Sequence, residues 1–290
     1  MAPSPGDYHG WFGTLRAQGE RAGKGGNRMT GKQGGKLSGR RAVITGGASG
    51  IGLAIAHAFA REGSPVHIVD VNQAGAQAAA EAIRAAGGAA EAHVGDVSDA
   101  ASVQTTFDGI FARGTVRILV NNAGVAHVGT VASTSEEDFD RLMRINVRSV
   151  YLCTRAVVER MKAQGGGVIL NMASIAAIAG LPDRFAYSTT KGAVLAMTFS
   201  IARDYMKDNI RCNAISPARV HTPFVDGFVA KNYPGREKEM MEVLGQAQPI
   251  GRMAEPEEVA NLAVWLCSDE ASFITGGNYP LDGGYMNLRG

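Results

Sequence analysis

Apolar and polar positions follow two alternating patterns along this chain. Short apolar runs that end in glycine or polar residues are followed by longer segments with helical spacing, as at 41–45 and then 51–61. Short apolar runs bounded by turn residues are typical of strands that are buried on both faces, as parallel strands are. The repeated order therefore predicts an α/β fold in which strands and helices alternate.

The same two patterns recur to the end of the chain without a linker or an internal repeat. We therefore expect one domain over 36–290, a Rossmann-type, doubly wound parallel sheet in three layers, because parallel strands need helical crossovers on both faces. The expected strands are 41–45, 65–70, 91–94, 116–121, 167–172, 210–215 and 279–281. The expected helices are 51–61, 73–86, 101–111 with Ser98 as its cap, 135–161 in two pieces, 186–206 and 255–267.

Residues 1–35 show neither period and are rich in glycine, lysine and arginine. We expect a flexible basic extension there, with an organelle-targeting peptide as the alternative. Residues 1–41 carry a net charge of +6, so the remainder carries −4 within the total of +2. A mildly acidic domain does not attract polyanions, and we expect no nucleic acid partner.

The three cysteines are Cys153, Cys212 and Cys267, far apart and without the spacing of paired ligands. This distribution argues against a disulfide framework and against a metal site, and it fits a reducing, cytoplasmic location. No apolar run approaches the roughly 20 residues that span a bilayer. The N-terminus also lacks the apolar segment of a secretory signal, and we expect no membrane partner.

A glycine-rich turn, Thr-Gly-Gly-Ala-Ser-Gly-Ile-Gly at 45–52, joins the first strand to the first helix. Open α/β sheets bind dinucleotides at this position. Gly46 allows the tight turn, Gly50 lets the backbone approach a pyrophosphate, and Gly52 allows close packing of helix and strand. The helix N-terminus offers free amides to phosphates. The alternative is a plain glycine-rich turn without a ligand.

Asp70 ends the second expected strand, 18 residues after Gly52. A carboxylate at this place binds the ribose hydroxyls of NAD and repels the 2′-phosphate of NADP. Neither Val71 nor Asn72 supplies a cation that would favour the phosphate. We therefore expect NAD, with NADP less favoured. The alternative role for Asp70 is to cap the helix that follows.

Tyr187 and Lys191 are spaced to lie on one face of the helix expected at 186–206. An ammonium beside a phenol favours the phenolate, so we expect a lowered pKa for Tyr187. Such a tyrosine is suited to move a proton on or off an alcohol oxygen. The pair alone is weak support, because this spacing is common by chance, and a solvated helix face is the alternative.

Five motifs in order together resemble the single-domain branch of the short-chain dehydrogenase/reductases over 36–287. They are the glycine turn, Asn121-Asn122-Ala123-Gly124, Ser174, the Tyr187–Lys191 pair and Ser216-Pro217. The resemblance implies that Tyr187 is the acid/base, that Lys191 tunes it and binds the nicotinamide ribose, and that Ser174 binds the substrate oxygen. It also implies that Asn146 holds a relay water. Taken singly, Ser174 could cap a turn, Asn146 could mark a helix bend, and Lys191 could form a surface ion pair.

The resemblance further implies a set of cofactor contacts spread over the ends of the expected strands. One departure from the family pattern is Ala218, where a glycine usually follows the proline; alanine restricts positive φ there. The implied cofactor contacts are Gly46, Ser49, Gly50, Ile51, Gly52, Asp70, Asp96, Val97, Asn122, Gly124, Tyr187, Lys191, Val220 and Thr222.

These residues together predict an NAD-dependent oxidoreductase that interconverts a secondary alcohol and a ketone. Substrate specificity is expected from loops 125–129, 175–184 and 221–253, the last with a charged helix near 236–239. Their polar and cationic side chains would suit a hydroxylated or carboxylate-bearing substrate: His127, Arg184, Arg219 and His221. Taken singly, Arg184 could form a structural ion pair and His127 could lie on the loop surface. The third loop also resembles that of sugar and sugar-acid dehydrogenases of this family, which implies a small polyol, sugar or deoxy-sugar acid. A 3-oxoacyl or other carbonyl reductase and a non-catalytic NAD-binding regulatory protein are the alternatives.

The expected helices at 135–161 and 186–206 resemble the subunit-contact helices of the same family. Symmetric closed assemblies are the common form of soluble oligomers. We therefore expect a homotetramer, with a dimer as the alternative.

Overall fold

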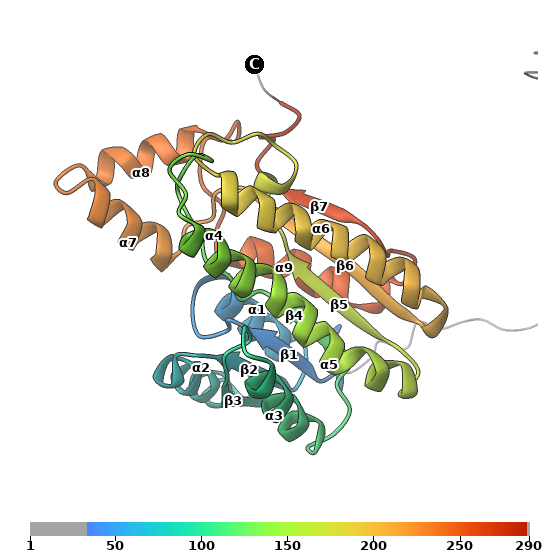
Figure 1. Ribbon diagram of the computed structural model, residues 1–290. Coiled ribbons are helices and arrows are strands. Elements are labelled where there is room, and N and C mark those ends of the chain that lie inside the picture. Colours follow the sequence, from blue (N-terminus) through green and yellow to red (C-terminus); the bar gives the residue numbers. More distant parts are fainter. Residues whose placement is uncertain (1–33, 289–290) are drawn as a thin grey trace, which may run out of the picture. The chain divides into compact units, whose positions relative to one another are not determined.

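A sheet of seven parallel strands forms the centre of the computed structural model, which describes residues 34–288 (Figure 1). The strand order is β3-β2-β1-β4-β5-β6-β7, so the chain starts in the middle of the sheet and extends it in both directions. The seven expected strands are all present, with ends that differ by at most two residues. They are β1 Ala42–Thr45, β2 Val66–Asp70, β3 Ala90–Val94, β4 Ile118–Asn121, β5 Gly167–Met172, β6 Ile210–Pro217 and β7 Asn278–Leu281.

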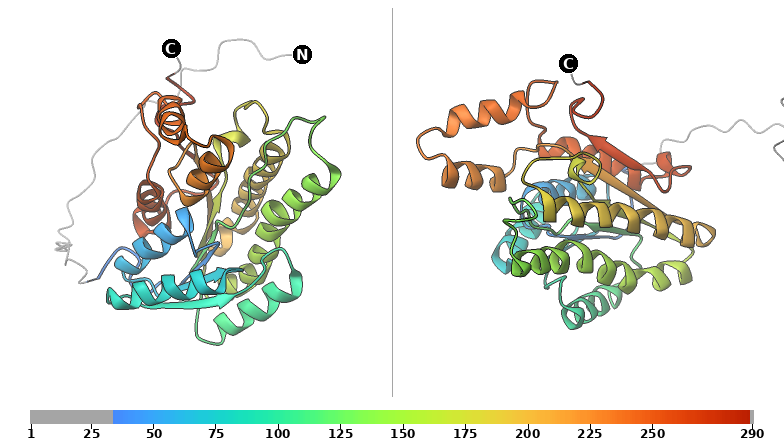
Figure 2. Two further views of the ribbon diagram at one scale, coloured as in Figure 1. Left: turned by 90° about the vertical axis from the view of Figure 1, so that its left-hand side faces the viewer. Right: turned by 45° about the horizontal axis from the view of Figure 1, so that its top comes forward.

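Helices cover both faces of this sheet, and Figure 2 shows the resulting three layers. The doubly wound α/β fold expected from the sequence is therefore confirmed. Helices α1, α2 and α9 supply buried side chains to one face, and α3, α5 and α6 supply them to the other. The helices are α1 Gly50–Arg61, α2 Gln73–Ala85, α3 Ala100–Phe111, α4 Glu136–Leu142, α5 Ser149–Ala163, α6 Phe185–Tyr205, α7 Pro223–Asn232, α8 Glu237–Gln246 and α9 Pro256–Cys267.

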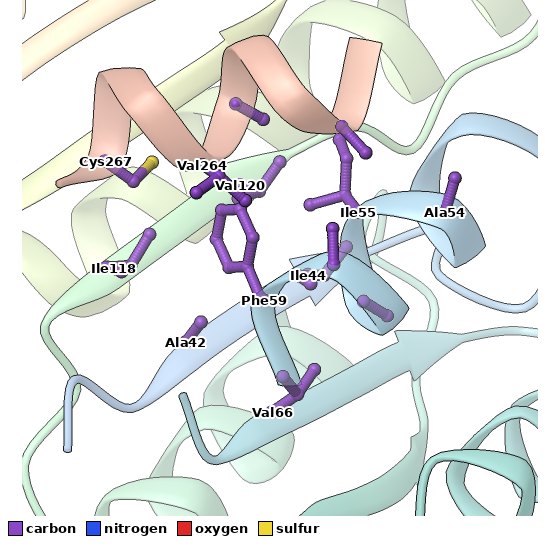
Figure 3. Packing of buried hydrophobic residues seen from close by; sticks show 14 of the residues in the cluster. Ala42, Ile44, Ala54, Ile55, Phe59, Val66, Ile118, Val120, Val264 and Cys267 are labelled. Atoms are coloured by element: carbon purple, nitrogen blue, oxygen red, sulfur yellow. The ribbon is translucent and has the colours of Figure 1, made fainter. Parts of the chain in front are cut away.

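Strand β1 shows why short runs of consecutive apolar residues form these strands. Ala42 and Ile44 face the α1 and α9 side, whereas Val43, between them, joins the cluster on the opposite face. Phe59 of α1 is fully buried over the sheet near Val264 of α9 (Figure 3). Because both faces of β1 are covered, Ala42, Val43 and Ile44 are apolar in succession rather than at every second position.

Helix α3 begins one residue earlier than expected, and its cap is not Ser98. The cap is Asp99, whose Oδ1 accepts a hydrogen bond from the Ser102 amide at 2.7 Å. Ser98 is buried, and its carbonyl accepts a hydrogen bond from Arg148. A carboxylate at the helix N-terminus also interacts favourably with the helix dipole.

The segment between β6 and α9 forms a hairpin of two helices, α7 and α8 (Figure 1). The sequence predicted the charged helix that became α8, but it did not predict α7. Both ends of the hairpin meet at Val220 and Ala254, which form a parallel bridge. The amide of His221 donates to the Ala254 carbonyl at 2.8 Å, so the hairpin leaves and rejoins the domain at one place.

The expected extension at 1–35 lies almost entirely outside the described residues and stays a prediction. The part of the chain from Gly34 onward forms one compact unit. Within the described residues, no helix combines the length and the apolar character that crossing a membrane requires.

Candidate active site

The glycine turn between β1 and α1 is closed so tightly that two of its glycines admit no side chain. Gly46 has a φ of 64°, and a Cβ there would lie 2.9 Å from the Ala123 Cα. A Cβ on Gly52 would lie 2.1 Å from the carbonyl oxygen of Gly46. Gly50 also has a positive φ, of 53°. The sequence analysis predicted the tight turn at Gly46 and the close packing of helix and strand at Gly52.

The N-terminus of α1 presents its first amides without a competing side chain. Ser49 is the N-cap, but its hydroxyl makes no capping hydrogen bond, and the first turn, which includes Ile51, contains no acidic residue. An α-helix leaves its first four amides without intrahelical partners, and its N-terminus carries a partial positive charge. The turn and the helix therefore fit the phosphates of a dinucleotide.

Asp70 lies beside this turn at the carboxyl end of β2. Its Oδ2 accepts a hydrogen bond from the Ala48 amide at 3.0 Å, and its Oδ1 accepts one from the Asn72 amide at 2.9 Å. The alternative role as a helix cap is wrong, because Asn72 caps α2 by accepting from the Gly75 amide. Asp70 thus holds a partly exposed carboxylate next to the site for the phosphates.

Asn122 joins the end of β4 to the glycine turn. Its Nδ2 donates to the carbonyls of Thr45 and Gly46, at 3.1 and 3.0 Å. The Thr45 hydroxyl in turn accepts from the backbone amides of Asn122 and Ala123. The sequence analysis did not predict that Thr45 binds these amides. Its local pattern does not indicate this contact, because the partners lie more than 70 residues away.

Asp96 and Val97 follow β3 at the same edge of the sheet. Asp96 is exposed and accepts a hydrogen bond from the Ser98 amide at 2.8 Å, while Val97 is buried. The family resemblance implies that both residues contact the cofactor. That assignment stays a prediction.

Asn146 lies in a π-helical turn, Met143–Arg148, inserted between α4 and α5. Its Oδ1 accepts from the Val125 amide at 2.8 Å. Its Nδ2 donates to the Val125 carbonyl at 2.8 Å and to the Thr190 hydroxyl at 3.1 Å. The side chain therefore ties a loop and α6 to an irregular helix, and π-helical turns occur frequently at functional sites. Its role toward a relay water stays a prediction.

Ser174 follows β5, and Tyr187 lies in the first turn of α6. The Ser174 hydroxyl accepts from the Ala176 amide at 3.2 Å, so it also caps a short 3₁₀ turn, Ile175–Ala177. Burial raises the pKa of the Tyr187 phenol, and a hydrogen bond with Ser174 and the charge of Arg184 act in the opposite direction.

Lys191 is buried below Tyr187 on α6 and does not contact the phenol oxygen through any described hydrogen bond. Its Nζ donates to the Met172 carbonyl at 2.7 Å and lies 5.8 Å from the centre of the Tyr187 ring. Desolvation lowers the pKa of Lys191 to about 8. The expectation that Lys191 lowers the Tyr187 pKa is thus wrong for the protein by itself, because desolvation outweighs the attraction of nearby charges.

The burial of Lys191 also excludes its alternative role as a surface ion-pair residue, since it is only 6% exposed. Gly124 shows how closely the loop after β4 approaches it. A Cβ on Gly124 would lie 3.1 Å from the Asn146 Oδ1 and 3.6 Å from the Lys191 Nζ. Glycine at this position therefore keeps space open between two of the expected catalytic residues.

The loop after β6 holds Val220 and Thr222 near the glycine turn. Thr222 precedes α7 without capping it, and its Cγ2 lies 3.5 Å from the place of a Cβ on Gly50. Ala218 donates its amide to the Leu281 carbonyl at 3.0 Å and does not have a positive φ. The alanine that departs from the family pattern is therefore accommodated without backbone strain.

Two of the loops expected to bind substrate are joined to each other. Gly129 and Arg184 form a parallel bridge, and the Gly129 amide donates to the Asp183 carbonyl at 2.9 Å. His127 lies between this pair and Asp138, with its Nδ1 3.9 Å from the Asp138 carboxylate. In the third loop, His221 pairs with Asp226 at 2.8 Å.

A cluster of possible metal ligands that the sequence did not predict lies on β2 and the edge strand β3, separate from this site. It comprises His67 on β2 with Glu91 and His93 on β3, whose ligand atoms all lie within 4.8 Å of one another. The strand register explains it, because His67 is paired directly with Glu91. Arg113 forms an ion pair with Glu91 at 3.1 Å, so the carboxylate of this cluster is already paired with a guanidinium group.

The fold is of the doubly wound α/β class, which commonly binds dinucleotides, and comparison with known proteins identifies the family. A family model described as enoyl-(acyl carrier protein) reductase matches residues 46–286. The chain is 40% identical over 251 residues to D-threitol dehydrogenase from Mycolicibacterium smegmatis, covering 86% of this chain and 94% of that protein. It is 38% identical over 253 residues to 2-keto-3-deoxy-L-fuconate dehydrogenase from Xanthomonas campestris, covering 87% and 82%.

Solved structures show the same relationship. L-sorbose reductase from Gluconobacter frateurii, complexed with NADPH and L-sorbose, has a TM-score of 0.83 at 34% identity, covering 87% of this chain and 98% of that one. The 3-ketoacyl-(acyl-carrier-protein) reductase from Brucella melitensis, complexed with NADH, has a TM-score of 0.78 at 36% identity, covering 86% and 99%. The chain belongs to the short-chain dehydrogenase/reductase family, and it is an oxidoreductase that acts on CH–OH groups.

Proposed function

We propose that this protein is an NAD-dependent oxidoreductase that interconverts a secondary alcohol and a ketone on a small polyol, sugar or deoxy-sugar acid. The observation that carries this proposal is the grouping of Ser174, Tyr187 and Lys191. Ser174 follows β5, and Lys191 on α6 donates to the last residue of β5, so all three lie at its carboxyl end. In open α/β sheets, ligands bind at this end of the strands.

Each side chain has a role that its surroundings support. Bound at the glycine turn, a nicotinamide cofactor supplies the acceptor or donor of hydride. The Ser174 hydroxyl donates a hydrogen bond to the substrate oxygen. The Tyr187 phenol gives its proton to that oxygen during reduction and takes the alcohol proton during oxidation. Lys191, held by the Met172 carbonyl, would bind the nicotinamide ribose beside the phenol.

Asp70 supports NAD rather than NADP as the cofactor. Its carboxylate is fixed by the amides of Ala48 and Asn72 at the place where the adenosine ribose of a dinucleotide lies in this class of fold. A fixed negative charge there repels a 2′-phosphate. The relatives do not share one cofactor, because one neighbouring structure holds NADPH and the other NADH. The preference therefore depends on the residues of this chain.

The relatives support a small polyhydroxylated substrate, since their names refer to threitol, a deoxy-fuconate and sorbose. A 3-oxoacyl or other carbonyl reductase is the second candidate, and the Brucella melitensis structure favours it. A non-catalytic regulatory protein is less well supported. Such a protein need not keep its catalytic groups, whereas this chain keeps Asn146, Ser174, Tyr187 and Lys191.

We also propose a homotetramer, with a dimer as the alternative, in the cytoplasm. Helices α5 and α6 support the assembly, because large apolar side chains remain exposed on them. Tyr151 is 51% exposed and Phe199 is 48% exposed. The three cysteines are all free and buried, which fits a reducing compartment. Multi-angle light scattering that finds a monomer would contradict the assembly.

Turnover by the purified protein tests the proposal directly. NAD and NADP are each offered with polyols, aldonic acids, 3-hydroxyacyl thioesters and steroids, and formation of the reduced cofactor is followed at 340 nm. We expect activity with NAD on polyols or sugar acids, and a loss of at least about 10²-fold in Tyr187→Phe. Tyr205→Phe, at the far end of α6, is the matched control. Activity confined to thioesters or steroids, or an active Tyr187→Phe protein, would contradict the proposal.

A further inference from the structure

Two arginines lie at the substrate end of the proposed active site. Arg184 immediately precedes α6, three residues before Tyr187. Arg219 follows β6, the strand that pairs with β5 and so ends beside Ser174. The Ala173 amide donates to the Ile215 carbonyl at 2.8 Å, which keeps these two strand ends together. Arg184 is therefore attached to the helix that carries Tyr187, and Arg219 follows the strand next to the one that leads to Ser174.

Neither guanidinium group has a carboxylate partner within residues 34–288. Nη1 of Arg184 makes only long contacts with backbone carbonyls, at 3.5 Å to His127 and 3.3 Å to Asp183. For Arg219, the hydrogen bonds within this part of the chain are those of its backbone, with Gln248 and Ala254. Some other arginines of the domain do have a carboxylate partner, as Arg252 does, which binds Glu258 with two nitrogens at 2.7 and 2.8 Å.

Two acidic side chains near these loops are engaged with other residues. Asp138 binds Arg141 at 2.9 Å, and Asp226 binds His221 at 2.8 Å. Asp183 precedes Arg184 directly, but within residues 34–288 its carboxylate forms no ion pair with either arginine. Each guanidinium offers several donors in a planar fork that matches a carboxylate.

The two arginines also act on each other. Burial lowers the pKa of Arg219, and the charge of Arg184 lowers it further, while Tyr285 acts in the opposite direction. Arg184 acts on the Tyr187 phenol as well. Two like charges close together repel each other, and an anion bound between them relieves the repulsion. The same charges would fix that anion beside the phenol that exchanges the proton.

We propose that Arg184 and Arg219 form a carboxylate-binding site, and that the substrate is a hydroxy acid or keto acid of the sugar-acid type rather than a neutral polyol. This inference rests on the proposed function of the same site. With the carboxylate held by the arginines, the reacting hydroxyl of the acid is directed to Ser174 and Tyr187. A neutral polyol has no group that could replace this contact with equal strength.

Matched substrate pairs test the inference. Each aldonic acid of four to six carbons is compared with the alditol of the same configuration, and kcat/KM is measured with NAD. We expect wild-type protein to prefer an acid over its alditol. We expect Arg184→Gln and Arg219→Gln each to lower kcat/KM for the acid by about tenfold to a hundredfold. The loss for the alditol should be much smaller, and Arg184→Lys should restore part of the activity on the acid, because it keeps the charge.

Arg61→Gln is the matched control, since Arg61 is exposed in the last turn of α1, at the opposite end of the sheet. Calorimetry with the protein and NADH adds a readout that needs no turnover, in which an aldonic acid should bind more tightly than its alditol. Binding of NADH alone is measured for each variant. Weakened NADH binding would show that the arginines serve the cofactor phosphates and would overturn the inference.

The outcomes separate this inference from the proposed function. If polyols and acids are both turned over but the arginine variants lose both equally, the carboxylate site is refuted and the oxidoreductase proposal stands. The carboxylate site is also refuted, and the oxidoreductase proposal stands, if no acid is turned over in preference to its alditol or bound more tightly than its alditol. If neither class is turned over and no aldonic acid binds to the protein with NADH, both proposals fail.

Discussion

A pair of hydrogen-bonded histidines allows us to predict how the stability of this domain depends on pH. His67 on β2 and His93 on β3 share a hydrogen bond of 2.8 Å between Nδ1 and Nε2. Such a bond needs at least one neutral ring, because one nitrogen must accept. The pKa of His67 is lowered from 6.5 to about 3, mainly by burial and also by the charges of His93, Arg41 and Arg113. The pKa of His93 is also lowered, mainly by burial.

The sign of the effect follows from proton binding. Between pH 6.5 and pH 3 the unfolded chain protonates this histidine and the folded domain does not, so acid favours unfolding. At pH 5 the unfolded imidazole is about 97% protonated, which corresponds to about 2 kcal/mol of lost stability relative to pH 7.5. This is a substantial share of the 5–15 kcal/mol typical of folded domains. Protonation of His93 adds to the loss in the same direction.

Urea unfolding at pH 7.5, 6 and 5 measures the effect. His67→Val is expected to lower stability at pH 7.5, but its stability should fall by about 2 kcal/mol less than that of the wild type on going to pH 5. Val69→Ala, on the same strand, destabilises the sheet without removing a titratable group and should keep the wild-type pH dependence. If His67→Val and the wild type lose the same free energy between pH 7.5 and 5, the pKa reasoning is refuted.

Two further predictions concern the cofactor site. In Gly52→Ala the new Cβ would lie 2.1 Å from the Gly46 carbonyl, so the turn must open; we expect NADH affinity, measured by fluorescence titration, to fall at least about tenfold. Gly109→Ala, where a Cβ meets nothing within 4 Å, is the control and should leave NADH affinity unchanged. Asp70→Asn keeps a hydrogen-bond acceptor but removes the charge, and the ratio of kcat/KM for NAD to that for NADP should fall by about tenfold or more. An unchanged ratio would contradict the role of Asp70 in cofactor choice.

The strands and most helices were predictable from the sequence because they depend on local patterns. A buried parallel strand has apolar residues in succession, as Ala42–Ile44 of β1 do, and glycines follow where it ends. Gly46 and Gly52 were predictable for the same reason, since the tight turn and the close packing leave no room for a Cβ. Once the strand ends are known, the edge of the sheet that carries the site follows from topology.

Features that depend on distant contacts were not predictable. The π-helical turn at Met143–Arg148 has an ordinary helical pattern, and what fixes it is the hydrogen bonding of Asn146 to partners 21 and 44 residues away. Helix α7 was missed because its sequence, Pro223–Asn232, mixes exposed apolar and polar residues without a clear buried face. The cap of α3 was misplaced by one residue, and adjacent serine and aspartate are equally good caps.

Tyr187 shows most clearly what three-dimensional context adds. Spacing alone predicted an ammonium next to the phenol and therefore a lowered pKa. In the structure the Lys191 ammonium is directed to the Met172 carbonyl, and the burial of both groups favours the neutral phenol. Tyr187 in its protonated form is ready to donate a proton in ketone reduction. Oxidation of an alcohol instead requires the phenolate, so its rate should rise with pH more steeply than the rate of reduction, whichever sugar derivative is the substrate.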